Sequence, residues 1–187
     1  MTTATLERVT TAEFLARADQ DDYELIDGEL KERCMGMEAA WVATQFATRL
    51  TNFNNEHRLG TVVGDNTPLQ IFGERQTIPR PDGLFVSVER HPSRAPVVGA
   101  LRVTPELVIE VVSPSDNAAE LMTKVLRYLD AGVDMVWVVY PESRSVHVIR
   151  ADLTGNVIRP PMNLDGGNIL PGFSHPVADF FPAPVPE

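Results

Sequence analysis

Asp82 and Glu110 are the two side chains whose type and position are best suited to chemistry. Glu110 interrupts the apolar, β-branched run Leu107–Val112, and Asp82 directly precedes a second strand-like segment, Gly83–Val88. If these segments pair antiparallel around a return loop centred near Pro96, Asp82 lies opposite Glu110, and alternation places both acids in apolar rows. Two buried carboxylates repel each other unless one is protonated or a cation lies between them.

A divalent metal ion held by oxygen ligands would offset the cost of burying Asp82 and Glu110 together. Simpler alternatives exist for each acid. Asp82 follows a proline at the start of a strand, where an aspartate often only caps a turn. Glu110 could instead form a structural ion pair with an arginine.

Lys124 is the third candidate. It lies about seven residues into a helix that we expect to begin after Asn117, which is roughly 10 Å along the helix axis. The helix runs back along the preceding strand, and roughly 10 Å back from Ser113, at about 3.3 Å per residue, is Glu110. The Lys124 ammonium therefore either points into the acidic site or extends to solvent, and the sequence leaves both alternatives open.

The segment Pro105–Tyr140 must position Glu110 and Lys124. Asn117, with an acid three residues later, is typical of a helix N-cap, and Gly132 is typical of the residue just past a helix end. A second continuous apolar run, Met135–Tyr140, follows. A strand, a helix and a strand within this length predict a crossover that joins two parallel neighbours.

The remaining elements are predicted from turn residues and apolar periodicity. Asp27-Gly28 is the strongest hairpin signal, and it lies between two short strand-like segments. We expect a long helix over about Glu38–His57 because its apolar residues recur on one face. The other predictions are a helix over Thr11–Ala18, strands at Tyr23–Ile26, Glu29–Glu32, Thr61–Gly64, Pro68–Phe72, Ser145–Arg150 and Asn156–Arg159, a turn at Leu164–Asn168 and a break at Pro171–Phe173.

Length and composition predict one globular domain over residues 1–181, followed by a frayed, proline-rich tail over residues 182–187. The predicted strands and helices make its fold class α/β (α+β). The chain has 187 residues, of which 43% are hydrophobic and 22% charged, and no apolar run approaches a membrane span. The N-terminus lacks the features of a signal peptide, so we expect a cytoplasmic protein. The single cysteine, Cys34, excludes an intrachain disulfide and a multi-thiolate metal site.

The net charge of -10, from 26 acidic and 16 basic residues, argues against non-specific attraction to nucleic acid. The segment Phe72–Arg102 is locally basic. It is either a basic rim or a solvated loop. Its arginines are Arg75, Arg80, Arg90, Arg94 and Arg102.

Five segments carry a resemblance to a known family: YELIDGEL, RPDGLFVS, PELVIEVVSPSD, KVLRYLDAGVDMVWVVYP and LPGFSHPVADFF. Asp82, followed by Glu110 in a core strand and a basic residue nearby, resembles the pattern of the PD-(D/E)XK nuclease superfamily, and the five segments give a closer match. They are similar to a bacterial family of putative restriction endonucleases, the Uma-two type. The resemblance implies a restriction-endonuclease-like mixed sheet flanked by helices, with an N-terminal β-hairpin, and a homodimer with a Mg²⁺ (or Mn²⁺) site.

The same resemblance assigns roles to single residues. Asp82 and Glu110 match the metal-binding acids, and we expect the backbone carbonyl of Val111 to complete the metal ligands. Lys124 matches the position of the family's catalytic lysine. Glu24 and Glu29 match acids of the N-terminal hairpin and are candidate helpers.

The sequence departs from the superfamily pattern at Val112, where a lysine is usual. The leading hypothesis is a Mg²⁺-dependent endonuclease that hydrolyses DNA phosphodiester bonds, without an organic cofactor and without a membrane partner. The alternative is a catalytically silent nuclease-fold domain that acts in nucleic-acid or protein binding or assembly. Val112 and the net charge favour the alternative, whereas Asp82, Glu110 and Lys124 favour the enzyme.

Overall fold

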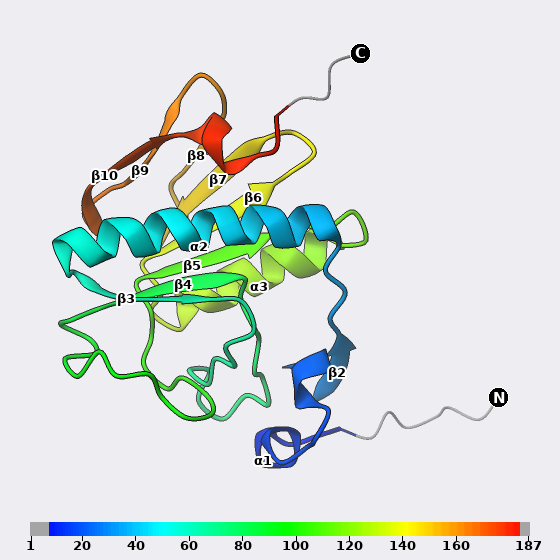
Figure 1. The fold of residues 1–187 in the computed structure, drawn as a ribbon. Coiled ribbons are helices and arrows are strands. Elements are labelled where there is room, and N and C mark those ends of the chain that lie inside the picture. The colour runs from blue at the N-terminus through cyan, green and yellow to red at the C-terminus, as the bar shows by residue number, and fades with distance from the viewer. Residues whose placement is uncertain (1–7, 184–187) are drawn as a thin grey trace.

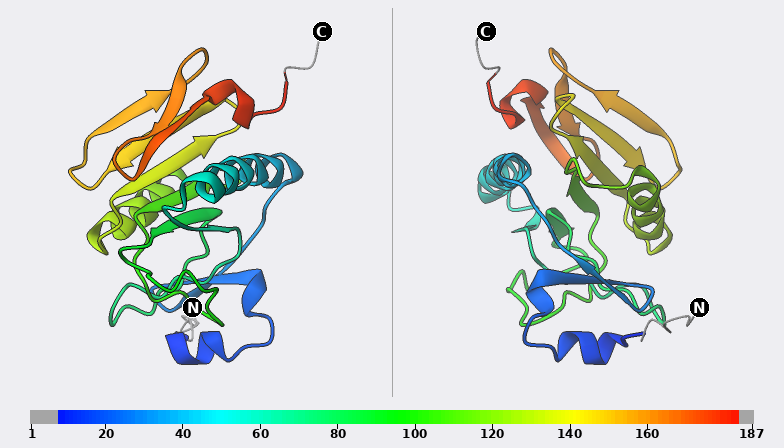
Figure 2. Two further views of the ribbon diagram at one scale, coloured as in Figure 1. Left: turned by 60° about the vertical axis from the view of Figure 1, so that its left-hand side comes forward. Right: turned by 90° about the vertical axis from the view of Figure 1, so that its right-hand side faces the viewer.

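The computed structural model describes residues 8–183. Its centre is a six-stranded mixed sheet, with α2 (Met37–His57) on one face and α3 (Ala118–Asp130) on the other (Figures 1 and 2). The strands in spatial order are β3 (Gly60–Gly64), β4 (Gly83–Ser87), β5 (Leu107–Val111), β6 (Met135–Tyr140), β7 (Ser145–Arg150) and β8 (Gly155–Ile158). Neighbours are antiparallel except β5 and β6, which are parallel and are joined by α3. The predicted fold class is confirmed.

The register of β4 and β5 is the one that the sequence predicts. Gly83 pairs with Ile109, and the backbone N–H of Asp82 donates to the carbonyl of Ile109 at 3.0 Å. Side chains alternate along β5, so Ile109 packs on the α2 side and Val108 on the α3 side. Glu110 shares the face of Val108, and its carboxylate therefore lies beneath α3.

The residues predicted to cap the two ends of α3 do so. The Asn117 side chain accepts hydrogen bonds from the backbone N–H groups of Ala119 and Glu120. Gly132 follows the helix with φ 91°, a left-handed conformation that glycine adopts without strain. The apolar stripe of α3 buries Val125 and Tyr128 against the sheet, which fixes the rotation of the helix about its axis.

The N-terminal hairpin lies apart from the central sheet (Figure 1). It follows α1 (Thr11–Leu15) and η1 (Gln20–Asp22) and consists of β1 (Tyr23–Ile26) and β2 (Glu29–Glu32). The predicted two-residue turn is confirmed, because Asp27 and Gly28 both have positive φ. A small core of Phe14, Leu25 and Ile78 attaches the hairpin to the loop before β4.

One predicted strand is absent, and one predicted helix is present but shorter than expected. Pro68–Phe72 is not a strand: Leu69 makes one isolated bridge to Leu101, and its N–H donates to the carbonyl of Pro79 instead of to a continuous partner. The predicted helix Thr11–Ala18 ends at Leu15, because Phe14 is its one buried residue and little core remains for a longer helix.

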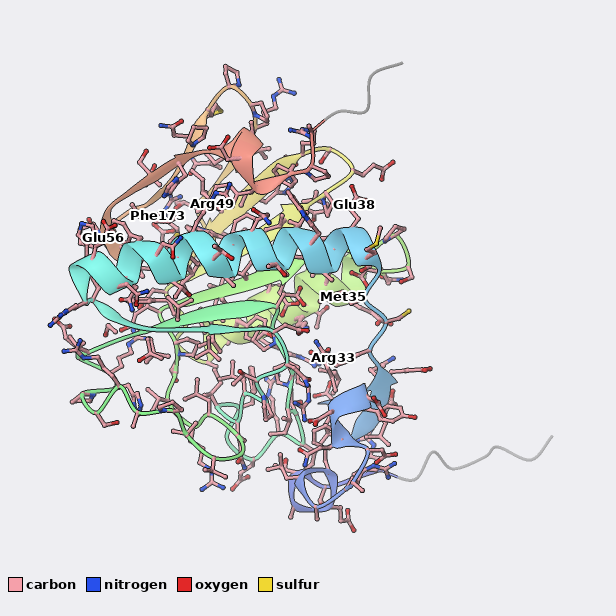
Figure 3. The ribbon with its side chains drawn as sticks, viewed as in Figure 1. Arg33, Met35, Glu38, Arg49, Glu56 and Phe173 are labelled. Carbon is pink, nitrogen blue, oxygen red and sulfur yellow. The ribbon has the colours of Figure 1, made fainter. Side chains whose placement is uncertain are left out.

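The C-terminal part is more regular than its turn residues suggest. The structure has two antiparallel strands here, β9 (Asn163–Gly166) and β10 (Leu170–Pro176), followed by η2 (Val177–Phe180). The predicted turn at Leu164–Asn168 overlaps the end of β9, and the predicted break at Pro171–Phe173 lies within β10, where the register shifts between Leu170 and Ser174. Burial of apolar side chains on one side of this hairpin overrides the turn chemistry. Phe173 packs beside α2, with its ring centroid 5.3 Å from that of Phe53 (Figure 3).

Residues 184–187, most of the predicted tail, lie outside the described residues, as do residues 1–7. Within residues 8–183, no helix combines the length and the apolar character that crossing a membrane requires.

Candidate active site

Asp82 and Glu110 are both buried, with 8% and 6% of their surfaces exposed. Asp82 lies just before β4 and Glu110 near the end of β5, so the β4–β5 register places them side by side. The Oδ2 atom of Asp82 accepts a hydrogen bond from the backbone N–H of Val111 at 2.5 Å. This bond anchors one carboxylate oxygen of Asp82 to the strand that carries Glu110.

Lys124 points into the acidic site rather than to solvent. Its Nζ atom donates to Oε1 of Glu24 at 2.9 Å and to Oε2 of Glu110 at 3.0 Å, and it lies 3.0 Å from the other oxygen of Glu110. Only 19% of the Lys124 side chain is exposed. Lys124 is on α3, Glu24 on the hairpin strand β1 and Glu110 on the core strand β5.

Two further groups complete the site, and sequence reasoning did not identify them. The Tyr128 hydroxyl donates to Oε1 of Glu110 at 2.6 Å, and the backbone N–H of Arg80 donates to Oε1 of Glu24 at 2.5 Å. Tyr128 follows Lys124 by four residues, so the two share one face of the helix. The spacing of four residues could have indicated that Tyr128 faces the same site as Lys124. The backbone N–H of Arg80 could not be predicted as a donor, because every residue except proline carries one.

Burial and like charge shift the pKa values of the acids. Burial, with a smaller contribution from the charge of Glu110, raises the pKa of Asp82 to about 8, against the opposing effects of the Val111 N–H and Lys124. Burial also raises the pKa of Glu110, although the Lys124 ammonium opposes the shift. Burial alone would lower the pKa of Lys124, but the Glu110 and Glu24 carboxylates outweigh it and the pKa is raised. One lysine thus faces three carboxylates, and a second cation would relieve the remaining repulsion.

The donor atoms of this site fit a magnesium ion. Carboxylate oxygens are hard ligands, and Mg²⁺ is usually bound through one or two carboxylates while it retains several waters. No cluster of three His, Cys, Asp or Glu side chains suited to a metal ion occurs within residues 8–183. Asp82 and Glu110 supply two carboxylates, and the roles of both residues, of the Val111 carbonyl and of Lys124 stay predictions.

The site opens into a cleft of about 860 Å³ between the β1–β2 hairpin and α3. Glu110 and Lys124 line the cleft, whereas Asp82 is buried and is not one of its lining residues. Of the two candidate helpers, Glu24 reaches Lys124, and Glu29 lies on the cleft wall.

Most of the charged side chains that line the cleft are acidic. The acids are Glu24, Asp27, Glu29, Glu32, Glu110, Asp116 and Glu120, and the bases are Arg8, Lys31, Lys124 and Arg127. Three of the four bases already pair with acids: Lys124 as above, Arg127 with Asp27, and Lys31 with Glu120 at 3.9 Å. The side chains of the cleft therefore offer little free positive charge to a phosphate.

The locally basic segment does not supply that charge through Arg80 or Arg90. Arg80 is 2% exposed and donates to the carbonyl of Asn66 at 2.7 Å. Arg90 pairs with Glu106 at 3.2 Å and with Asp134 at 2.6 Å. Two of the five arginines of that segment thus serve the structure instead of forming a rim.

Comparison with solved structures bears on the fold. Among solved structures, the chain is similar to one described as a putative nuclease belonging to DUF820 from Anabaena variabilis, with a TM-score of 0.77 and 18% sequence identity. The similarity covers 92% of this chain and 97% of that one, and it shows that the two chains share a fold.

The family follows from the sequence itself. The chain belongs to the Uma2 family, described as "Putative restriction endonuclease", whose model matches residues 11–178. The expected family is thereby confirmed. No curated protein matches the chain.

Proposed function

We propose that this protein is a Mg²⁺-dependent endonuclease that hydrolyses phosphodiester bonds of DNA. The observation that carries the proposal is the Lys124 ammonium, which lies between Glu24 and Glu110 and near Asp82. Val112 stands where the superfamily usually has its lysine, and it can neither donate a proton nor attract an anion. Lys124, on the neighbouring helix α3, instead supplies a cation next to the carboxylate of Glu110.

Asp82 and Glu110 would hold the metal ion, with the Val111 carbonyl as a further ligand. A bound Mg²⁺ supplies Lewis acidity, which lowers the pKa of a coordinated water and neutralises charge on the phosphate. Lys124 orients the attacking water or stabilises negative charge that develops on the phosphate oxygens. Glu24 holds Lys124 in place, and the Arg80 N–H in turn orients Glu24.

The acidic cleft favours the second candidate function, a silent nuclease-fold domain that binds a partner. Its lining bases are mostly neutralised by ion pairs, and phosphate binding by side chains usually requires clustered free cations. The endonuclease accounts for this charge balance only if a metal ion provides the positive charge that faces the phosphate. The two candidates therefore differ in whether DNA is cleaved when Mg²⁺ or Mn²⁺ is supplied.

The decisive experiment measures conversion of supercoiled plasmid to nicked and linear forms by purified protein, with Mg²⁺ or Mn²⁺ and with EDTA. We expect metal-dependent cleavage that Glu110→Gln abolishes. The matched control is Glu106→Gln, which also neutralises a buried carboxylate. Glu106 precedes the first residue of β5, at the other end of the strand from Glu110, and its carboxylate is bound by Ser87 and Arg90. Glu106→Gln should lower stability and leave cleavage per folded molecule intact.

Cleavage by Glu110→Gln at the wild-type rate would assign the activity to a contaminant and refute the site. If wild-type protein cleaves neither duplex nor single-stranded DNA with either metal, the binding domain becomes the leading function.

A further inference from the structure

Tyr128 is a buried polar group to which the proposed mechanism assigns no part. Its side chain is 0% exposed and lies in the apolar cluster between α3 and the sheet, with its ring centroid 5.9 Å from that of Phe72. Its hydroxyl reaches Oε1 of Glu110 at 2.6 Å. A hydroxyl in such surroundings requires a partner, and this one has a carboxylate that the proposed function makes a metal ligand.

We propose that Tyr128 is a positioning residue that orients Glu110 for metal binding, an inference that rests on the proposed function. Tyr128 and Lys124 lie one helical turn apart on α3 and hold the same carboxylate. The hydroxyl donates to Oε1 and the ammonium to Oε2, so the carboxylate plane is set by two points on one rigid helix. The packing of α3 against the sheet thereby fixes the direction in which Glu110 presents its remaining lone pairs.

Removal of the hydroxyl has a specific consequence. Oε1 of Glu110 would lose the hydrogen bond from the hydroxyl while it remains buried, and the Lys124 ammonium, 3.0 Å from each oxygen, would be the one side-chain donor left to the carboxylate. The carboxylate would then be held by the ammonium alone, and no second fixed point would keep its remaining lone pairs directed at a cation. Substitutions that remove hydrogen-bond partners of metal ligands commonly weaken metal binding by about 10- to 100-fold.

The test titrates Mn²⁺ into DNA-free protein by isothermal calorimetry and compares wild type with Tyr128→Phe. We expect the dissociation constant for Mn²⁺ to rise about 10- to 100-fold. The control is Val125→Ala, which removes packing from the same helix face but no polar group. It should lower the melting temperature and leave Mn²⁺ affinity unchanged. Equal Mn²⁺ affinity of Tyr128→Phe and wild type would overturn the inference.

A double-mutant comparison shows whether Tyr128 acts through Glu110. In a Glu110→Gln background, the same Tyr128→Phe substitution should have no further effect on residual Mn²⁺ binding. This background also removes the buried charge that would otherwise lose its partner, so the comparison holds even if the single variant does not fold. A further loss of affinity in that background would show that Tyr128 acts elsewhere and refute the proposal.

The outcomes separate the inference from the function on which it rests. If wild-type protein binds no Mn²⁺, the metal-dependent function fails and the inference fails with it. If wild type binds Mn²⁺ and Glu110→Gln binds it more weakly, but Tyr128→Phe binds as wild type does, the function stands and only the role of Tyr128 is refuted.

Discussion

Asp82→Asn should stabilise the metal-free protein although it removes a proposed metal ligand. Asparagine has nearly the same shape as aspartate, and its side-chain oxygen can still accept the Val111 N–H that Oδ2 accepts now. The substitution removes the negative charge that burial and Glu110 both disfavour. Aspartate is thus costly to the fold in the absence of metal, as expected of a residue retained for a ligand.

The magnitude follows from the pKa shift. The pKa of Asp82 rises from 3.8 to about 8 on folding, so the unfolded state ionises first and stability falls as pH rises from about 4 to 8. Near pH 7 the group is about three pH units above its unfolded pKa, and at about 1.4 kcal/mol per unit the cost to the fold is at most about 4 kcal/mol. An asparagine amide left partly without partners costs about 1–3 kcal/mol. We expect a net stabilisation of about 1–3 kcal/mol.

The assay is urea unfolding in EDTA between pH 5 and pH 9, with the free energy of unfolding compared between wild type and Asp82→Asn. The advantage of the variant should be near zero at pH 5, grow up to about pH 8 and then stay constant. Near pH 7, saturating Mn²⁺ should reverse the order, because wild type alone gains about 4.1 kcal/mol at one thousand times its dissociation constant. A variant that is less stable than wild type in EDTA at pH 8, or a difference that does not change with pH, would refute the assigned burial cost.

Three further predictions concern the lysine, the helix cap and assembly. Lys124→Met should lower the free energy of unfolding in EDTA by about 3–5 kcal/mol, because Glu24 and Glu110 lose their shared cation. It should also reduce cleavage about 100-fold while Mn²⁺ affinity by calorimetry is kept or increased; cleavage at the wild-type rate would leave Lys124 a purely structural role. Asn117→Ala should cost about 1 kcal/mol in urea unfolding, because two α3 N–H groups lose their acceptor, and no loss would contradict the cap. Sedimentation at tens of micromolar should show a homodimer, since cutting both strands of a duplex takes two sites; a monomer would contradict this expectation.

The sequence by itself determined the parts of the site that follow from counting along regular elements. The β4–β5 register that sets Asp82 beside Glu110 could be predicted, because strand alternation and a central return loop leave few other pairings. The position of Lys124 alongside Glu110 could be predicted by comparing the rise per residue of the helix with that of the strand it runs back along. The hairpin turn at Asp27-Gly28 depends on local chemistry that tertiary contacts did not override.

Only the tertiary structure decided which side chains meet the two core acids. Glu24 and Lys124 are 100 residues apart in the chain, and Glu24 has the same local pattern whether it is solvated or buried. The hydrogen bond of the Tyr128 hydroxyl could not be predicted either, because the sequence does not distinguish a tyrosine that binds a carboxylate from one that only packs in the core. Local patterns set periodicity and turns, whereas the pairing of polar groups depends on how separate elements dock, and docking is determined by burial over the whole chain.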